Sequence, residues 1–160
     1  MFLQKNQCII SSIENTDEGI AFSELGYDDL QNLTETHLYQ TEMPSVLRFA
    51  IEYDGQQAGE ISLKSIRWFN HKAEIAIFIH KPFRGKGLAE QALRMMLHYA
   101  FHTMNFYRIE AEVVAYNPAA RAVFEKLGFK QEGVLREAKF FAGKYHDIYA
   151  YGLLAKEWRS

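Results

Sequence analysis

A glycine-containing loop carries the residues best suited to chemistry, and it reads Arg84-Gly85-Lys86-Gly87-Leu88-Ala89. The run Ala73–Ile79 before it is almost wholly apolar and predicts a buried strand. After it, small and apolar residues recur with helical spacing and predict an amphipathic helix: Ala89, Ala92, Leu93, Met96, Leu97, Ala100 and Met104. A helix start leaves N–H groups unpaired, and glycines let that backbone approach an anion closely. The loop therefore predicts a pyrophosphate site.

Two other phosphate-binding patterns do not fit this loop. The P-loop pattern needs Gly-Lys-Ser/Thr shortly after a glycine, and no such segment is present. The dinucleotide fingerprint needs three spaced glycines after a first strand, whereas this loop has two glycines and lies in mid-chain. The loop therefore indicates another class of anion site.

The composition predicts one globular domain over residues 1–160. The chain has 160 residues, of which 48% are hydrophobic, and this is enough for a sizeable core. Cys8 is the only cysteine, which excludes a disulfide framework and fits a reducing, cytoplasmic location. The N-terminus lacks a signal-peptide pattern, and no apolar run reaches the roughly 18 residues of a membrane span. We expect no membrane partner.

Nucleic-acid and metal sites are also not expected. The pI of about 6.3 and the dispersed aromatic residues argue against a nucleic-acid partner. His98 and His102 stand one helical turn apart, a spacing that can bind a metal ion. However, Tyr99 occupies the position where the zinc-protease pattern needs a glutamate.

Charge is divided unevenly along the chain. Residues 1–60 carry eleven Asp or Glu and two Lys or Arg, whereas the remaining hundred carry nine Asp or Glu and sixteen Lys or Arg. The basic part contains the anion loop, so its sign suits a polyanionic cofactor. An ordinary mixed surface is the alternative interpretation.

The remaining patterns predict strands and helices around the loop. Before it we expect strands over Gln7–Glu14 and Ile20–Leu25, a helix after Asp28, and a hairpin of Val46–Tyr53 with Ala58–Ile66 around Asp54-Gly55. After it we expect a strand over Tyr107–Ala115 that is parallel to Ala73–Ile79, because a helix connects the two. A short helix with Asn117 as N-cap, Pro118 in its first turn and Gly128 after its end follows, and then a hairpin of Val134–Phe141 with Tyr145–Leu154.

Several of these segments resemble one family. The loop matches R/Q-x-x-G-x-G/A, and Asn117-x-x-Ala120 followed by Phe124-Glu125-Lys126-Leu127-Gly128-Phe129 is similar to the N-x-x-A/S…Y-E-K-L-G-F segment of the GNAT superfamily of N-acetyltransferases. The sequel, Glu132-Gly133-x-x-Arg136 and Gly143-Lys144-Tyr145-x-Asp147, resembles the branch of ribosomal-protein N-terminal and spermidine acetyltransferases. The resemblance covers roughly residues 58–155 and is weak before Tyr53.

The resemblance implies a fold and a cofactor site. The fold is an α/β domain with a central, mostly antiparallel sheet, one parallel pair and flanking helices. Main-chain groups of Phe78 and Ile79 would bind the pantetheine arm of acetyl-CoA, and the N–H groups of Arg84, Gly85, Lys86, Gly87, Leu88 and Ala89 would bind its pyrophosphate. Asn117 would donate a hydrogen bond to the cofactor, or would serve only as an N-cap.

The reaction that the resemblance implies is direct attack of an amine on the thioester, without a covalent intermediate. An alkylamine has a pKa of about 10, so a base must first remove a proton from it. Glu74 is our candidate, because it is a lone carboxylate in an apolar strand and resembles the strand glutamate that serves as base in part of the family. Pairing with Lys or Arg, solvent exposure, a water-mediated base, Glu110 and Glu112 are the alternatives.

The general acid stays unassigned. Many relatives have a tyrosine at the position of Phe124, and some have a serine at the position of Ala120, but both are apolar here. Tyr116, Tyr145 and Tyr149 are alternative candidates for the acid, and each also fits a structural role as a core or surface aromatic residue. A non-catalytic acyl-CoA-binding or sensing module is therefore the rival interpretation. Expected partners are a small-molecule amine or a protein N-terminus, and the chain could also form a homo-oligomer.

Overall fold

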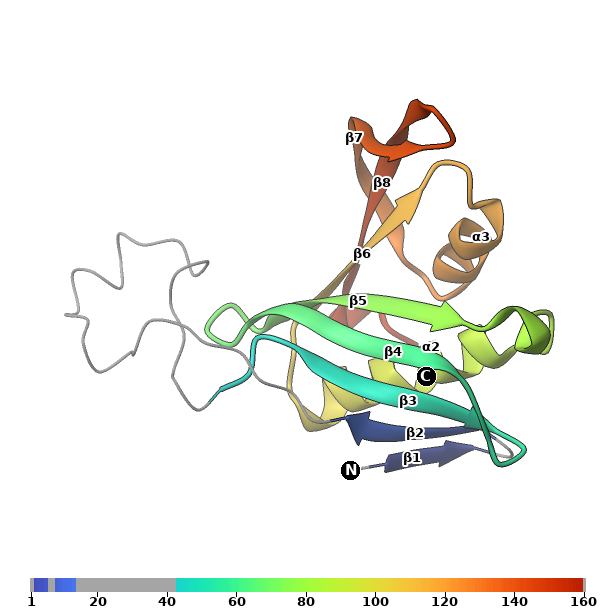
Figure 1. The fold of residues 1–160 in the computed structure, drawn as a ribbon. Helices are drawn as coiled ribbons and strands as arrows, with labels where there is room; N and C mark the ends of the chain where they lie inside the picture. Colours follow the sequence, from blue (N-terminus) through green and yellow to red (C-terminus); the bar gives the residue numbers. More distant parts are fainter. Residues whose placement is uncertain (1, 6–7, 14–42, 160) are drawn as a thin grey trace.

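The computed structural model describes residues 2–5, 8–13 and 43–159, and its centre is one eight-stranded sheet. The strands follow the order β1-β2-β3-β4-β5-β6-β8-β7 (Figure 1). Their bounds are β1 Phe2–Lys5, β2 Cys8–Ile13, β3 Leu47–Tyr53, β4 Gln56–Arg67, β5 Lys72–Ile79, β6 Arg108–Val114, β7 Lys130–Phe141 and β8 Lys144–Leu154. The helices are α2 Leu88–His98, continued by a π-helical turn Tyr99–Thr103, and α3 Pro118–Lys126, with short 3₁₀ turns at Lys81–Phe83 and Ala155–Glu157.

The sheet divides into two arms between β5 and β6. All neighbouring strands are antiparallel except this pair, which is parallel and pairs only over Lys72–Glu74 and Arg108–Glu110. Beyond Glu74 the two strands separate, so β1–β5 form one arm and β6–β8 form the other (Figure 1). The predicted fold class, a mostly antiparallel sheet with one parallel pair and flanking helices, is confirmed.

Helix α2 covers one face of the first arm. Its apolar side is buried, with Leu93, Met96 and Leu97 inaccessible to solvent, and it belongs to the same core cluster as Ile61, Leu63 and Ile75. The other face of β4 and β5 carries Glu60, Ser62 and Lys64 opposite Phe78, Ala76 and Glu74. We call this second surface the open face, because it lies on the side away from α2 and leaves Phe78 half exposed.

Most predicted elements coincide with observed ones. The Asp54-Gly55 turn has positive φ at both residues, 53° and 73°, as a two-residue hairpin of this kind requires. Asn117 caps α3 by accepting a hydrogen bond from the N–H of Ala120 at 3.1 Å, and Gly128 follows with φ 92°. The parallel pairing and the C-terminal hairpin are also confirmed.

Two predictions needed correction. Strand β1 was not expected, and the predicted helix from Ala89 to Met104 is α-helical only to His98. A π turn follows, in which the N–H of Met104 bonds to the carbonyl of Tyr99, and Asn105 at φ 56° directs the chain into β6. The predicted strand Ile20–Leu25 and the helix after Asp28 lie outside the described residues.

Candidate cofactor pocket and active site

A pocket of about 480 Å³ lies where the two arms separate. Its wall is formed by the end of β5, the glycine loop, the start of α2 and the inner side of α3. The lining residues are Ile77, Phe78, Ile79, Phe83, Arg84, Gly85, Gly87, Leu88, Ala89, Glu90, Leu93, Asn117, Ala119, Ala120, Val123 and Phe124. The pocket thus brings two motifs together that are about thirty residues apart in the sequence.

The edge of β5 that borders this pocket has no strand partner in the described structure. Pairing with β6 ends at Glu74, whereas Ile77, Phe78 and Ile79 continue as a strand that pairs only with β4. Main-chain N–H and C=O groups that are left unpaired favour any ligand that can supply the missing hydrogen bonds. An extended chain with amide groups, such as pantetheine, has the chemistry to do so.

The glycine loop presents unpaired N–H groups at the start of α2. Gly85 and Gly87 have φ of 78° and 74°, and Gly87 is the N-cap without any side-chain capping bond. A Cβ at Gly85 would meet nothing within 4 Å, so the backbone there is open to a ligand. The helix dipole adds partial positive charge at this point. These residues therefore fit a pyrophosphate group.

The two cations of the loop are held by neighbours. Arg84 donates its Nε–H to the carbonyl of Ile79 at 2.9 Å and lies near the Phe78 ring. Lys86 Nζ lies 4.9 Å from the centre of the Tyr53 ring and 5.5 Å from that of Phe83. Lys86 is thus the loop residue from the predicted cofactor set that does not line the pocket, whereas Arg84 does.

Glu74 is not brought to the pocket. Its Oε1 lies 2.8 Å from Lys64 Nζ on the open face, and its side chain is 18% exposed. Among the alternatives, Glu110 is held by Lys72 at 3.2 Å and by Arg108 at 2.8 Å. Burial raises the pKa of Glu110, but the hydrogen bonds from Arg108 and Lys72 outweigh it and leave the pKa below its ordinary value. Both carboxylates therefore serve ion pairs.

The pocket wall formed by α3 is apolar at Phe124 and Ala120, the two positions where relatives have a hydroxyl group. Phe124 is 4% exposed and packs edge-on against Phe129, with ring centres 5.0 Å apart. Tyr116 stacks on Phe141, Tyr145 contacts Phe140, and Tyr149 lies under the Arg121 guanidinium. None of these three tyrosines lines the pocket. The described residues therefore supply no hydroxyl from the predicted positions.

Glu90 is a pocket residue that sequence reasoning missed. Its Oε2 lies 2.6 Å from Lys126 Nζ of α3, and its Oε1 lies 3.2 Å from Arg94 Nε. The hydrogen bond from Lys126 and, to a smaller extent, that from Arg94 lower the pKa of Glu90. The spacing of Glu90 and Arg94 is visible in the sequence, but nothing local indicates Lys126, 36 residues away.

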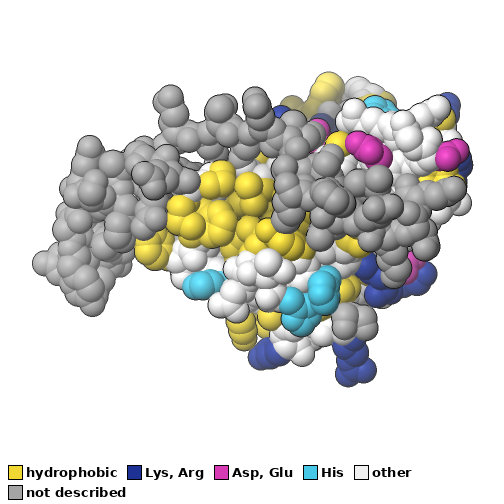
Figure 2. All heavy atoms as spheres, turned by 90° about the horizontal axis from the view of Figure 1, so that it is seen from below, with side chains coloured by type: hydrophobic (Ala, Val, Ile, Leu, Met, Phe, Trp, Pro, Cys, Tyr) yellow, Lys and Arg dark blue, Asp and Glu magenta, His cyan; other side chains and the backbone are white. Residues whose placement is uncertain are grey.

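The described residues hold no metal site around the two histidines that the sequence singled out. His98 and His102 are exposed with ring centres 4.5 Å apart, and histidines are visible beside an apolar area in Figure 2. No group of three or more potential metal ligands occurs among the described residues. Within the same residues, no helix is long and apolar enough to cross a membrane.

A family model describes this arrangement. The acetyltransferase (GNAT) domain matches residues 17–130, which is more than half of the chain. The chain belongs to the GNAT acetyltransferase family. The glycine loop and the Asn117 segment of this family member therefore line one pocket, as the resemblance implied.

Relatives and solved structures agree with this assignment. The YdaF protein of Bacillus subtilis, which carries a provisional name as a ribosomal N-acetyltransferase, is 40% identical over 106 residues, covering 66% of this chain and 58% of the relative. The spermidine N(1)-acetyltransferase of Escherichia coli K12 is 34% identical over 119 residues, covering 74% of this chain and 62% of the relative. The matches thus span less than two thirds of either relative.

The fold is shared with spermidine N-acetyltransferase of Vibrio cholerae. Its complex with CoA and spermine is 28% identical, with a TM-score of 0.68 over 83% of this chain and 78% of that one. Its dodecameric structure is 27% identical, with a TM-score of 0.72 over 94% of this chain and 95% of that one. The similarity therefore includes a relative that was solved with CoA bound.

Proposed function

We propose that residues 1–160 act as one N-acetyltransferase domain that transfers acetyl from acetyl-CoA directly to a primary amine. The observation that carries this proposal is the pocket, because it joins a free strand edge to a helix N-terminus with two glycines. The first feature fits the amides of pantetheine and the second fits a pyrophosphate. Family membership supports the same cofactor.

Each predicted cofactor residue has a role in this proposal. Main-chain groups of Phe78 and Ile79 bind the pantetheine arm, and the N–H groups from Arg84 to Ala89 bind the pyrophosphate. Binding would compete with two hydrogen bonds of this structure, from Arg84 Nε to the Ile79 carbonyl and from the Arg84 N–H to the Lys81 carbonyl. Asn117 accepts from the Ala120 N–H through Oδ1, so its Nδ2 is left to donate to the cofactor. Acetyl-CoA supplies an activated acetyl thioester at this place.

Direct transfer is supported by the state of the single thiol. Cys8 is 1% exposed and belongs to β2, outside the pocket lining. Burial raises the pKa of this thiol, so its nucleophilic thiolate form is disfavoured. An acyl-cysteine intermediate is therefore not part of the proposal.

The described pocket residues include no assigned general base and no assigned general acid. The sequence nominated Glu74 as base, and this assignment stays a prediction, which the ion pair between Glu74 and Lys64 does not favour. Phe124 and Ala120 give the departing sulfur no acid. A thiol has a pKa of about 8.5, so the thiolate can leave without a protein acid.

Relatives support a proposal for the acceptor and for the assembly. Two relatives of Escherichia coli K12 are named as a spermidine N(1)-acetyltransferase and a ribosomal-protein-serine acetyltransferase. We therefore propose a primary amine of a polyamine, an amino sugar or a protein N-terminus as acceptor. A homo-oligomer is part of the proposal, because β7 ends the sheet and exposes Phe140, Phe141 and Tyr145 on its hairpin, and one relative is dodecameric.

The rival function is a non-catalytic acyl-CoA-binding module, which Phe124 and Ala120 favour. Initial rates of thiol release from acetyl-CoA, measured with a panel of spermidine, glucosamine and peptides with free N-termini, distinguish the two. Amine-dependent thiol release is expected. Calorimetric binding of acetyl-CoA without thiol release for any amine would favour the rival.

A further inference from the structure

The open face holds a second carboxylate close to the pocket. Glu60 of β4 is directly opposite Phe78 of β5 in the antiparallel register, and Phe78 lines the pocket. Residues that are directly opposite have Cβ atoms about 5 Å apart. Glu60 is not itself a lining residue, but it lies beside the stretch of β5 that borders the pocket.

Glu74 lies much further along the same strand. It lies four positions before Phe78, and at about 3.3 Å per residue this places it roughly 13 Å away. A glutamate side chain is too short to cover such a distance. Glu74 is also directly opposite Lys64 and forms an ion pair with it.

Glu60, like Glu52 of β3 and Glu112 of β6, has no ion-pair partner among the described residues, and of these three it is the one directly opposite a pocket residue. The carboxylates of Glu74, Glu90, Glu110, Glu125, Glu132 and Glu157 all form ion pairs. No hydrogen bond or ion pair with another described residue engages Glu60. A carboxylate without a cationic partner is free to accept a proton, which is the task of a general base.

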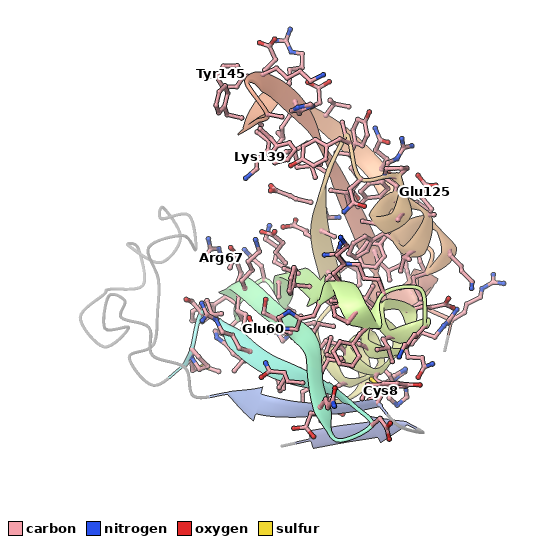
Figure 3. The ribbon with its side chains drawn as sticks, turned by 45° about the vertical axis from the view of Figure 1, so that its right-hand side comes forward. Cys8, Glu60, Arg67, Glu125, Lys139 and Tyr145 are labelled. Atoms are coloured by element: carbon pink, nitrogen blue, oxygen red, sulfur yellow. The ribbon has the colours of Figure 1, made fainter. Side chains whose placement is uncertain are left out.

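Backbone packing fixes where Glu60 sits. The preceding residue, Gly59, lies so close to β5 that a Cβ on it would be 2.1 Å from the carbonyl oxygen of Phe78. Next to Gly59 along β4, the carbonyl of Ala58 accepts a hydrogen bond from the N–H of His80 at 2.8 Å. Figure 3 shows Glu60 on the first arm of the sheet and Lys139 on the second. Glu60 is thus held by main-chain contacts at the pocket end of β4.

We propose that Glu60 is the general base for the acceptor amine, which rests on the proposed acetyl transfer. Its carboxylate takes a proton from the ammonium nitrogen, and the freed lone pair attacks the thioester carbon. The C–N bond forms and the C–S bond breaks. Of the two protons that the nitrogen loses, one passes through Glu60 to solvent and the other is taken up by the departing thiolate.

Other charged or titratable side chains lie around the same position. Arg48 and Glu52 of β3 lie diagonally to Glu60, and Lys64 follows on β4. His80, directly after β5, packs against Phe78 with ring centres 5.1 Å apart. Lys64 is occupied by Glu74. The acceptor amine itself, with a pKa of about 10, is the group whose deprotonation Glu60 assists.

The test compares Glu60→Gln, Glu74→Gln and Glu112→Gln, with Ser62→Ala as a neutral control on the same face of β4. Spermidine is the probe, and kcat/KM is measured from pH 6 to pH 10. Glu60→Gln should lower kcat/KM about a hundredfold at neutral pH. This loss should shrink as the pH approaches the pKa of the free amine, because more of the amine is then already deprotonated. Its calorimetric affinity for acetyl-CoA should stay within about twofold of wild type, since a base acts on the acceptor.

A second variant covers the chance that Glu60→Gln is unstable. Glu60→Ala should be inactive at neutral pH and should regain rate when formate is added as an external carboxylate. A wild-type pH profile for Glu60→Gln, or the large loss in Glu74→Gln or Glu112→Gln instead, would overturn the assignment. If the wild-type protein itself transfers acetyl to no amine, both this inference and the proposed function fail. If it does so and Glu60→Gln matches it, only the role of Glu60 fails.

Discussion

At the scale of single residues, glycines decide how closely ligand and backbone approach. Gly87 is the N-cap of α2 in the left-handed region, and Gly59 allows β4 to approach the carbonyl of Phe78. In the first case the absence of a side chain leaves room for a ligand, and in the second it leaves room for a strand. Substitutions at the two sites should therefore have different consequences.

Gly87→Trp should weaken acetyl-CoA binding at least tenfold, because it places a ring where the pyrophosphate meets the loop. Isothermal titration calorimetry measures this directly. Gly143→Trp is the matched control, since Gly143 has φ 79° and lies in the β7–β8 turn, outside the pocket lining. Both variants should lose a similar stability of about 1–2 kcal/mol from backbone strain. Equal acetyl-CoA affinities for the two variants would remove the loop from the cofactor site.

Gly59→Ala should lower the melting temperature strongly, because its Cβ would lie 2.1 Å from a backbone oxygen that cannot move without displacing β5. Overpacking of this kind costs about 1–3 kcal/mol or more. Gly133→Ala in β7 is the control, since nothing lies within 4 Å of its added Cβ. Thermal unfolding of the two variants tests the close approach, and equal melting temperatures would argue against it.

At the scale of elements, α2 and α3 are joined across the pocket by Glu90 and Lys126. Lys126→Met should weaken acetyl-CoA binding about two- to fivefold and stability by under about 1 kcal/mol, because the Lys126 side chain is 63% exposed and screened by water. Calorimetry and urea unfolding measure the two effects. Lys130→Met, which breaks the pair with Glu157 away from the pocket, should leave binding unchanged.

The pH dependence of this pair has a defined sign. The pKa of Glu90 is lowered in the folded protein, mainly by the hydrogen bond from Lys126, so the pair stabilises the fold above the unfolded value of 4.5. That stabilisation disappears as the pH falls through the lowered folded pKa. The difference in unfolding free energy between wild type and Lys126→Met should therefore be present at pH 7 and vanish in acid. A constant difference would contradict the ion pair.

Local signals account for the parts of the site that the sequence predicted. The apolar run of β5, the glycine loop and the Asn117 cap depend on neighbours within a few residues, and the structure has all three. The environment of Glu74 in β5 depends on its pairing with Lys64 in β4. Directly after Lys64 the register of β4 shifts, and Ser65 has a positive φ of 50°. Nothing in the sequence reveals that register. For the same reason the position of Glu60 opposite Phe78 could not be predicted.

At the scale of the whole molecule, the acidic first part of the chain bears on the choice of acceptor. Eight of its eleven Asp or Glu residues lie between Glu14 and Glu42, outside the described residues, so the idea stays a prediction. A negative field attracts cationic amines, and salt weakens it as the Debye length falls from about 10 Å at 0.1 M. Spermidine should therefore have a higher kcat/KM than glucosamine, with a KM that rises with ionic strength. Equal values that are insensitive to salt would favour an ordinary solubilising surface.

Direct transfer from acetyl-CoA to an amine is the central claim, and a single-turnover experiment tests it most directly. Excess wild-type protein is mixed with acetyl-CoA and spermidine, and the protein and the small molecules are analysed by mass spectrometry over time. We predict that acetylspermidine and free CoA appear together in equal amounts while the mass of the protein stays unchanged. Acetyl on the protein before it reaches the amine, or intact acetyl-CoA throughout, would contradict the account.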